Sequence, residues 1–434
     1  MTKHRMNKEL SSFAARLRDS ILSEGRVPRV PDLKNRNGDS SLRDFDSLAL
    51  ALFTLQFENN AAYRTICEAR GLTPKAVEHW TQIPAVPTGA FKELELVCIP
   101  PDERTAVFHS SGTTEQKPSR QFHTAESLAV YEASLWKWFA ANVAIRTPNS
   151  GPASFKSGIA GADLEIGVPL ARQVQLIALT PPPAQAPHSS LVHMFETVRR
   201  KLGAPESVFV GQIDANGVWA LDFDAALAVI QRSGVSAERR NFPNAGGAAL
   251  CRNAATPQIL LGTAFSFVHL LDYLAERDLR IKLPADSRVM ETGGYKNRSR
   301  SLPKSELHAL ITERLGIPLE NIICEYGMSE LSSQAYDQEA RSAECGVRSF
   351  KFPPWARAQL ISPETGREVA DGETGLIRVF DLANVFSVAA VQTEDLGIRR
   401  GDGFELNGRA QLAEPRGCSL MSYSALRTPH SGLK

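Results

Sequence analysis

The feature that most constrains the fold is a regular alternation of two patterns between residues 174 and 325. Short apolar runs occur at 174–179, 208–211, 259–262, 288–291 and 321–325. Between them, apolar residues recur at helical spacing, at 189–202, 224–230, 265–275 and 304–315. Such alternation is typical of βαβ units around a parallel sheet. We therefore predict an α/β fold whose ligand site opens at the carboxyl ends of the strands.

The flanking regions have different patterns. Apolar spacing predicts helices over 7–24, 46–60 and 128–143, the last of them capped by Thr124 or Ser127. Beyond residue 352, short strands are expected at 357–361, 375–380, 386–392 and 404–411, joined by Gly, Pro and Asp turns. We predict an N-terminal helical segment (1–44), an α/β core (45–350), a small antiparallel β subdomain (351–422) and a flexible tail (423–434).

Composition excludes several classes of protein. A net charge of +1 without a long basic cluster disfavours nucleic-acid binding. The N-terminus has no apolar signal region, and the most apolar segment, 259–275, is shorter than the ~20 residues of a membrane span. A cytoplasmic protein without a membrane span is expected. Six cysteines without a C-x-x-C pair indicate neither a zinc site nor a disulfide framework.

Residues 108–120 combine one glycine, five hydroxyl side chains, a lysine and an arginine. Glycine allows close approach of a ligand to the main chain, and N–H groups, hydroxyls and a lysine can surround phosphate. The P-loop spacing is absent, because Lys117 is followed by Pro118. From composition alone, a solvated Ser/Thr turn and a phosphate-binding loop both stay open.

Four segments together resemble the adenylate-forming enzymes, the superfamily of acyl-CoA ligases and luciferases. They are Ser110-Ser111-Gly112-Thr113-Thr114 with Lys117, Gly293-Gly294, Tyr326-Gly327-Met328-Ser329-Glu330, and Thr393-Glu394-Asp395 followed by Gly408-Arg409. Further segments narrow the resemblance to the LuxE-like acyl-protein synthetases. These are residues 83–92, Pro187-His188-Ser189-Ser190 and Arg416-Gly417-Cys418-Ser419-Leu420. The match covers roughly residues 45–422.

The resemblance implies the large N-terminal-type domain of adenylate-forming enzymes. This sequence departs from the family at Glu115, where glycine is usual, and at Glu394, where Thr-Gly-Asp is usual. Only 25 residues follow Arg409, whereas coenzyme A ligases continue into a mobile domain with a catalytic lysine. We therefore expect the usual mobile C-terminal domain to be missing.

The resemblance also assigns roles to residues of the site. Phosphate contacts are implied for Ser110, Ser111, Gly112, Thr113, Thr114 and the catalytic Lys117, and adenine contacts for Gly293, Gly294 and Tyr326. Gly327 is implied to bind the nucleotide cofactor. Ser329 is implied to contact the α-phosphate or acyl-adenylate, and Glu330 to hold Mg²⁺, which prefers oxygen ligands. Asp395 is implied to bind the ribose hydroxyls, Arg409 to reach the ribose or the phosphate, and Cys418 to be the nucleophile that takes the acyl group.

The implied function is ATP- and Mg²⁺-dependent activation of a carboxylic acid to acyl-AMP, followed by transfer to Cys418 as a thioester. A fatty or an aromatic acid is the expected substrate, and an acyl reductase or acyltransferase is the expected protein partner. Two alternatives stay open. One is a truncated acid–coenzyme A ligase that works with a separate partner domain, and the other is a non-catalytic nucleotide-binding scaffold.

Overall fold

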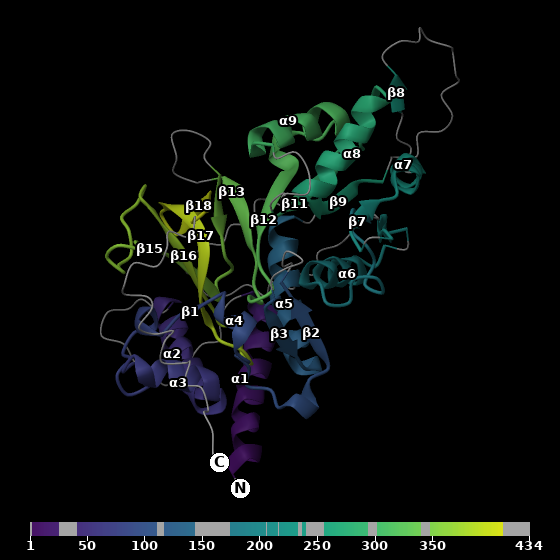
Figure 1. The fold of residues 1–434 in the computed structure, drawn as a ribbon. Coiled ribbons are helices and arrows are strands. Elements are labelled where there is room, and N and C mark those ends of the chain that lie inside the picture. The colour runs from purple at the N-terminus through teal and green to yellow at the C-terminus, as the bar shows by residue number, and fades with distance from the viewer. Residues whose placement is uncertain are drawn as a thin grey trace, which may run out of the picture.

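The computed structural model describes residues 2–25, 41–110, 117–143, 174–204, 206–215, 217–232, 237–239, 256–293, 302–339 and 348–410. Its centre is a 12-stranded mixed sheet (Figure 1). The strand order is β15-β16-β17-β18-β14-β13-β12-β11-β9-β4-β5, and β1 (Val86–Pro87) pairs with β17 beside this path. The chain therefore has the predicted α/β character.

One half of the sheet is parallel. It contains β4 (Gln175–Ala178), β5 (Val208–Phe209), β9 (Gln258–Thr263), β11 (Arg288–Thr292) and β12 (Ile322–Tyr326). The helices between and beside them are α6 (Ser190–Leu202), α7 (Phe223–Arg232), α8 (Ala264–Glu276) and α9 (Lys304–Leu315). The predicted βαβ pattern is confirmed, with α9 ending at Gly316, whose φ of +66° suits a helix terminus.

Helices cover both faces of this half. Side chains alternate between the faces of a strand, and Val289 and Ile322 belong to the apolar cluster that contains α8 and α9 residues. Their neighbours Met290 and Ile323 belong to the cluster of α5 (Ala125–Asn142) and α6. Figure 1 shows α8 above β9 and α6 below it. The parallel half is thus the middle layer of three.

The other half of the sheet is antiparallel. Its strands are β13 (Ala335–Glu339), β14 (Arg348–Lys351), β15 (Ala356–Ile361), β16 (Thr374–Asp381), β17 (Ala390–Arg400) and β18 (Gly403–Arg409). The expected antiparallel strands are present, and the β12–β13 pairing joins them to the parallel half.

The predicted strand at 386–392 was placed too early. β17 begins at Ala390, and the residues before it are buried and apolar without being part of a strand. Their polar groups are bonded elsewhere, because Ala389 N–H donates to Gln56 Oε1 and Ser387 Oγ donates to Leu96 O. Residues 386–389 therefore form a turn that is tied to α2 (Ser41–Asn59).

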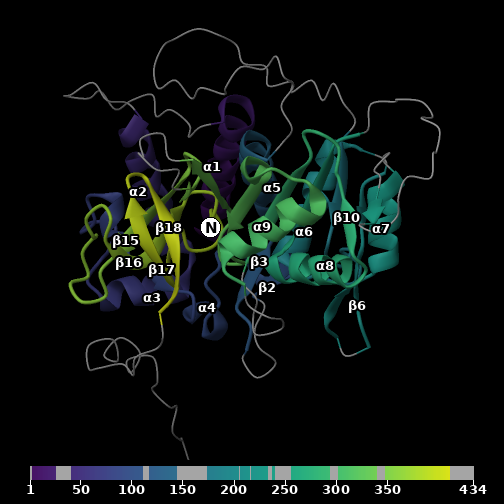
Figure 2. The ribbon, with the colours of Figure 1, turned by 90° about the horizontal axis from the view of Figure 1, so that it is seen from above.

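The N-terminal helices are α1 (Thr2–Glu24), α2 and α3 (Ala61–Ala69). Leu10, Phe13, Leu17 and Ile21 of α1 are buried, as their spacing predicts. Figure 2 shows α2 and α3 beside the antiparallel strands. Among the described helices, none is both long and apolar enough to cross a membrane.

The remaining elements are short. The helices are α4 (Ala90–Glu93), η1 (Trp80–Gln82), η2 (Pro101–Glu103) and η3 (Leu319–Asn321). The strand pairs outside the main sheet are β2 (Ala106–His109) with β3 (Arg120–His123), β6 (Gly211–Ile213) with β7 (Trp219–Leu221), and β8 (Ala237–Arg239) with β10 (Leu279–Ile281).

Candidate active site

The hydroxyl-rich segment connects the two strands of the β2–β3 hairpin, which sequence patterns did not reveal. Both ends of the connection are tied together. Ser110 N–H donates to Ser119 O at 3.2 Å, and Ser119 N–H donates to Ser110 Oγ at 2.9 Å. The predicted phosphate contacts Ser111, Gly112, Thr113 and Thr114 lie outside the described residues. The described base of the hairpin therefore fixes where this segment leaves and rejoins the protein.

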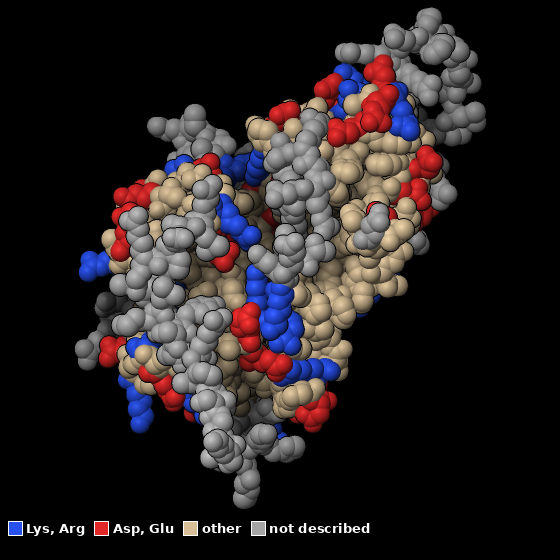
Figure 3. All heavy atoms as spheres, viewed as in Figure 1, with Lys and Arg blue, Asp and Glu red and all other residues tan. Residues whose placement is uncertain are grey.

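Lys117 lies at the surface beside this base. Its side chain is 54% exposed, and its Nζ is 3.8 Å from Glu93 Oε2. Arg120 and Arg104 both contact Glu95, and basic and acidic side chains lie next to one another over α4 and the hairpin (Figure 3). Exposed ion pairs are worth only ~0–1 kcal/mol. Lys117 can therefore leave Glu93 at little cost to meet an anionic ligand.

The hairpin contacts the segment that follows β12. Ser119 Oγ is 3.4 Å from Ser329 Oγ, and Ser329 Oγ donates to Glu330 Oε2 at 3.0 Å. Glu330 is only 5% exposed, and no lysine, arginine or histidine of the described residues lies within ion-pair distance of its carboxylate. A buried carboxylate among hydroxyls is an oxygen-donor set that suits Mg²⁺. The residues present thus fit the predicted metal.

A buried polar scaffold that sequence analysis missed holds this segment in place. Asp381 Oδ2 accepts from the N–H groups of Ser332 and Ser333, while Asp381 Oδ1 accepts from Ala383 N–H. Asn384 Nδ2 donates to Glu330 O at 2.8 Å. Burial raises the pKa of Asp381 to about 6, although its hydrogen bonds act in the opposite direction. These contacts set the position of the Glu330 backbone.

Tyr326, Asp395 and Arg409 meet at the junction of the two sheet halves. Tyr326 Oη donates to Asp395 Oδ2 at 2.9 Å, and Arg409 Nε donates to Asp395 Oδ1 at 3.2 Å. Strand pairing places Asp395 opposite Arg409. Burial, and next the negative charge of Asp395, raise the pKa of Tyr326. The predicted ribose residues therefore lie beside the predicted adenine residue.

The ring of Tyr326 is buried against other aromatic side chains. Phe404 and Phe352 meet it nearly edge-on, with centroid distances of 5.3 and 6.3 Å. In the described residues, the best-defined role of Tyr326 is to orient Asp395 through its hydroxyl. Its role as a face for adenine stays a prediction.

The two glycine positions follow adjacent strands. Gly293 comes directly after β11 and has a φ of +70°, which favours glycine. Gly327 follows β12, and a Cβ there would clash with the Glu325 carboxylate. Thr292 Oγ1 donates to Glu325 Oε2, and burial raises the pKa of Glu325 to about 7. Glu325 is a buried acid at the strand end that sequence analysis did not single out.

The structure thus brings the described site residues together around the carboxyl end of β12. The hairpin base reaches Glu330 through Ser329, and Asp395 and Arg409 reach the same segment through Tyr326. Gly293 directly follows the neighbouring strand β11. Two further predicted residues, Gly294 and the nucleophile Cys418, lie outside the described residues.

Sequence comparisons find similarity to one family of known proteins. Residues 248–426 match the family model described as the acyl-protein synthetase LuxE. A long-chain-fatty-acid–luciferin-component ligase of Vibrio harveyi is 23% identical over 394 residues, which cover 89% of each chain. A protein with the same description from Aliivibrio fischeri is 29% identical over 185 residues, which cover 39% of this chain and 46% of the relative.

Solved structures share the fold. A 2-hydroxyisobutyryl-CoA ligase in an open conformation, in complex with 2-HIB-AMP and CoA, superposes with a TM-score of 0.55 at 13% identity. The alignment covers 88% of this chain and 81% of that one. The same ligase in its postadenylation state gives a TM-score of 0.56 at 12% identity, over 88% and 73% of the two chains. At this identity the likeness shows the fold alone, which this chain shares with the 2-hydroxyisobutyryl-CoA ligase.

Proposed function

We propose that this chain, a relative of the LuxE acyl-protein synthetases, is a ligase that activates a long-chain carboxylic acid with ATP and then carries the acyl group on Cys418. The observation that carries the first step is the contact between Ser119 and Ser329. It brings the base of the hydroxyl-rich hairpin to a segment that holds a buried carboxylate without a cationic partner among the described residues.

In the first step, a carboxylate oxygen of the acid forms a bond to the α-phosphorus of ATP, and the bond from that phosphorus to pyrophosphate breaks. Such a reaction depends on positioning and on neutralising phosphate charge. Ser110 and Lys117 flank the hairpin tip, where they can contact the β- and γ-phosphates. Asp395 is already oriented by Tyr326 and Arg409, and its remaining lone pairs can accept from the ribose hydroxyls.

Glu330 is the residue that would hold Mg²⁺. Mg²⁺ held there would supply positive charge that offsets the charge of the departing pyrophosphate. Ser329 holds one carboxylate oxygen of Glu330 by a hydrogen bond, and Asn384 fixes the Glu330 main chain. These contacts orient the carboxylate before a nucleotide arrives.

In the second step, the Cys418 sulfur forms a bond to the acyl carbon. The bond from that carbon to AMP breaks, AMP leaves, and the thiol proton passes to solvent. A thiolate is the reactive form of cysteine. The match of residues 248–426 to the LuxE family includes this cysteine and supports the assignment. The descriptions of both bacterial relatives support a long-chain fatty acid as substrate, and an acyl reductase or acyltransferase would receive the acyl group.

Intact-protein mass spectrometry tests the second step. The full chain is incubated with ATP, Mg²⁺ and a panel of fatty, aromatic and short-chain acids. We expect the protein mass to increase by one acyl group. Hydroxylamine should remove this adduct, and peptide digestion should map it to Cys418. Cys418→Ser should lose the adduct, whereas Cys98→Ser, which removes a buried thiol, should keep it. An adduct that persists in Cys418→Ser contradicts the assignment.

Acyl transfer to added coenzyme A by a variant that lacks Cys418 would instead favour a truncated acid–coenzyme A ligase.

A further inference from the structure

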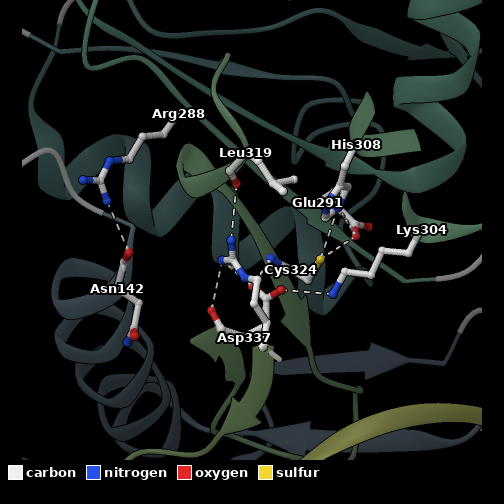
Figure 4. Close-up of polar contacts among 9 residues, drawn as sticks. Asn142, Arg288, Glu291, Lys304, His308, Leu319, Cys324 and Asp337 are labelled. Carbon is white, nitrogen blue, oxygen red and sulfur yellow. Dashed lines mark hydrogen bonds and ion pairs between the residues drawn. The ribbon is translucent and has the colours of Figure 1, made fainter. Parts of the chain in front are cut away.

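Three metal-binding side chains meet on the face of the sheet that α9 covers. Glu291 comes from β11, Cys324 from β12 and His308 from α9 (Figure 4). Parallel pairing places Glu291 beside Cys324, and their side chains point toward α9. Cys324 Sγ is 2.7 Å from Glu291 Oε1 and 3.5 Å from His308 Nε2. Glu291 Oε1 and His308 Nε2 are 3.5 Å apart.

All three side chains are buried, on elements whose apolar residues form part of the hydrophobic core. A carboxylate in such surroundings is costly unless it is paired or binds a metal. The partners of Glu291 in this cluster are a thiol, which is a weak donor, and an imidazole. Among the described residues, this is the one group of three or more Cys, His, Asp or Glu ligand atoms that converge closely enough for a metal ion.

The separations agree with those around zinc. Zn–S bonds of ~2.3 Å and Zn–N bonds of ~2.0 Å at a tetrahedral angle place sulfur and nitrogen about 3.5 Å apart. The same geometry places nitrogen and carboxylate oxygen about 3.4 Å apart. The observed Sγ–Nε2 and Oε1–Nε2 distances are both 3.5 Å. The Sγ–Oε1 distance of 2.7 Å is shorter than this geometry requires, and it would widen to about 3.6 Å when both atoms bind the ion.

We propose that Glu291, His308 and Cys324 bind a divalent, borderline-soft metal ion, with Zn²⁺ the best match to this ligand set. On binding, the thiol proton leaves to solvent, sulfur forms a bond to the ion, and Glu291 Oε1 and His308 Nε2 each donate a lone pair. No electron is transferred. The fourth position of the ion takes a water molecule or another exogenous ligand.

Neighbouring charged side chains fix the backbone of one ligand, Cys324. Asp337 accepts from Cys324 N–H at 2.7 Å and pairs with Lys304 Nζ and Arg348 Nη2, each at 3.0 Å. Asp337 is therefore engaged by cations and fixes the Cys324 backbone without being a ligand itself. The bound ion would join α9 to β11 and β12, the strands that lead to Gly293 and Tyr326. It would be distinct from the Mg²⁺ that Glu330 is proposed to hold.

The test uses the full chain and does not depend on enzymatic activity. Metal content is measured by inductively coupled plasma mass spectrometry after purification without chelator and after dialysis with Zn²⁺. Co²⁺ then replaces Zn²⁺ as a spectroscopic probe, because thiolate-bound cobalt absorbs in the near ultraviolet. We expect about one zinc per chain, and a cobalt–thiolate band that Zn²⁺ abolishes.

Variants locate the site. Cys324→Ser should lose the cobalt–thiolate band, and His308→Ala and Glu291→Gln should each weaken Zn²⁺ binding by at least about 10-fold. Cys98→Ser, another buried cysteine, should keep both properties. Circular dichroism checks that each variant is folded. Zinc far below one equivalent in the dialysed wild-type protein, together with no cobalt–thiolate band, would overturn the proposal without relying on any variant. A band that survives in folded Cys324→Ser would overturn it as well.

Discussion

Ser119 and Ser329 lie 210 positions apart in the chain, and their side-chain oxygens are 3.4 Å apart in the protein interior. Ser119 is the last hydroxyl residue of the hydroxyl-rich segment, and Ser329 directly precedes the buried Glu330. This contact therefore joins the two halves of the proposed nucleotide site.

The serine contact should couple the hairpin to Glu330. A hydrogen bond of this kind contributes ~0.5–1.5 kcal/mol. We expect Ser119→Ala and Ser329→Ala each to lower the rate of acid-dependent pyrophosphate exchange, with Ser329→Ala the more severe because it also removes the bond to Glu330. In a double-mutant cycle, the double variant should lose less than the product of the two single losses. Strictly multiplicative effects would contradict the coupling.

The Tyr326 hydroxyl should matter for ATP binding. Tyr326→Phe keeps the ring but frees one oxygen of Asp395, the proposed ribose ligand. We expect KM for ATP to rise about 3- to 10-fold with little change in kcat, as for the loss of one hydrogen bond. The matched control is Tyr336→Phe, because the buried Tyr336 hydroxyl has no hydrogen-bond partner among the described residues. An unchanged KM for ATP in Tyr326→Phe would contradict a role of the Tyr326–Asp395 hydrogen bond in ATP binding.

His123, on β3 of the same hairpin, should make stability depend on pH. Burial, and next the neighbouring His193, lower the pKa of His123 from 6.5 to about 3. Because the folded-state pKa is depressed, the contribution of His123 is fully present above pH 6.5. It is lost as pH falls through the window from 6.5 to 3. At pH 5 the free energy of unfolding should therefore be about 2 kcal/mol lower than at pH 7 through His123 alone.

Urea unfolding at pH 7 and pH 5 measures this loss. Between these two pH values, the free energy of unfolding of His123→Gln should fall by about 2 kcal/mol less than that of the wild-type protein. The partly exposed His79 provides the control, since His79→Gln should keep the wild-type decrease. Equal pH dependence in His123→Gln and the wild-type protein would contradict the assignment.

Much of the fold could be predicted from the sequence, because strong periodicity and clear terminators mark its elements. The predicted helix over 304–315 coincides with α9, which Pro303 precedes and Gly316 ends. The parallel strands were found from short apolar runs that are buried from both sides. The β2–β3 hairpin was not predicted, because its strands are only four residues long and carry polar residues such as His109 and Arg120. A long connection also separates the two strands.

The candidate site was only partly predictable for a related reason. Motifs identify residues that are close in sequence, such as the segment from Tyr326 to Glu330. The contacts of Asp381 and Asn384 with that segment depend on tertiary packing. The same holds for Glu291, His308 and Cys324. Cysteine spacing indicated no zinc site, because these ligands come from two strands and a helix rather than from one short motif.

We propose that the chain transfers adenylate to a carboxylic acid at the site around Glu330. Acid-dependent exchange of labelled pyrophosphate into ATP measures that step directly and does not involve Cys418. We predict exchange with a long-chain fatty acid in the wild-type protein, and a loss of at least about 100-fold in Lys117→Ala and Glu330→Gln. Glu93→Gln, which removes only the exposed partner of Lys117, should exchange at the wild-type rate. No exchange with any acid of the panel, or full exchange in Glu330→Gln, would contradict the claim.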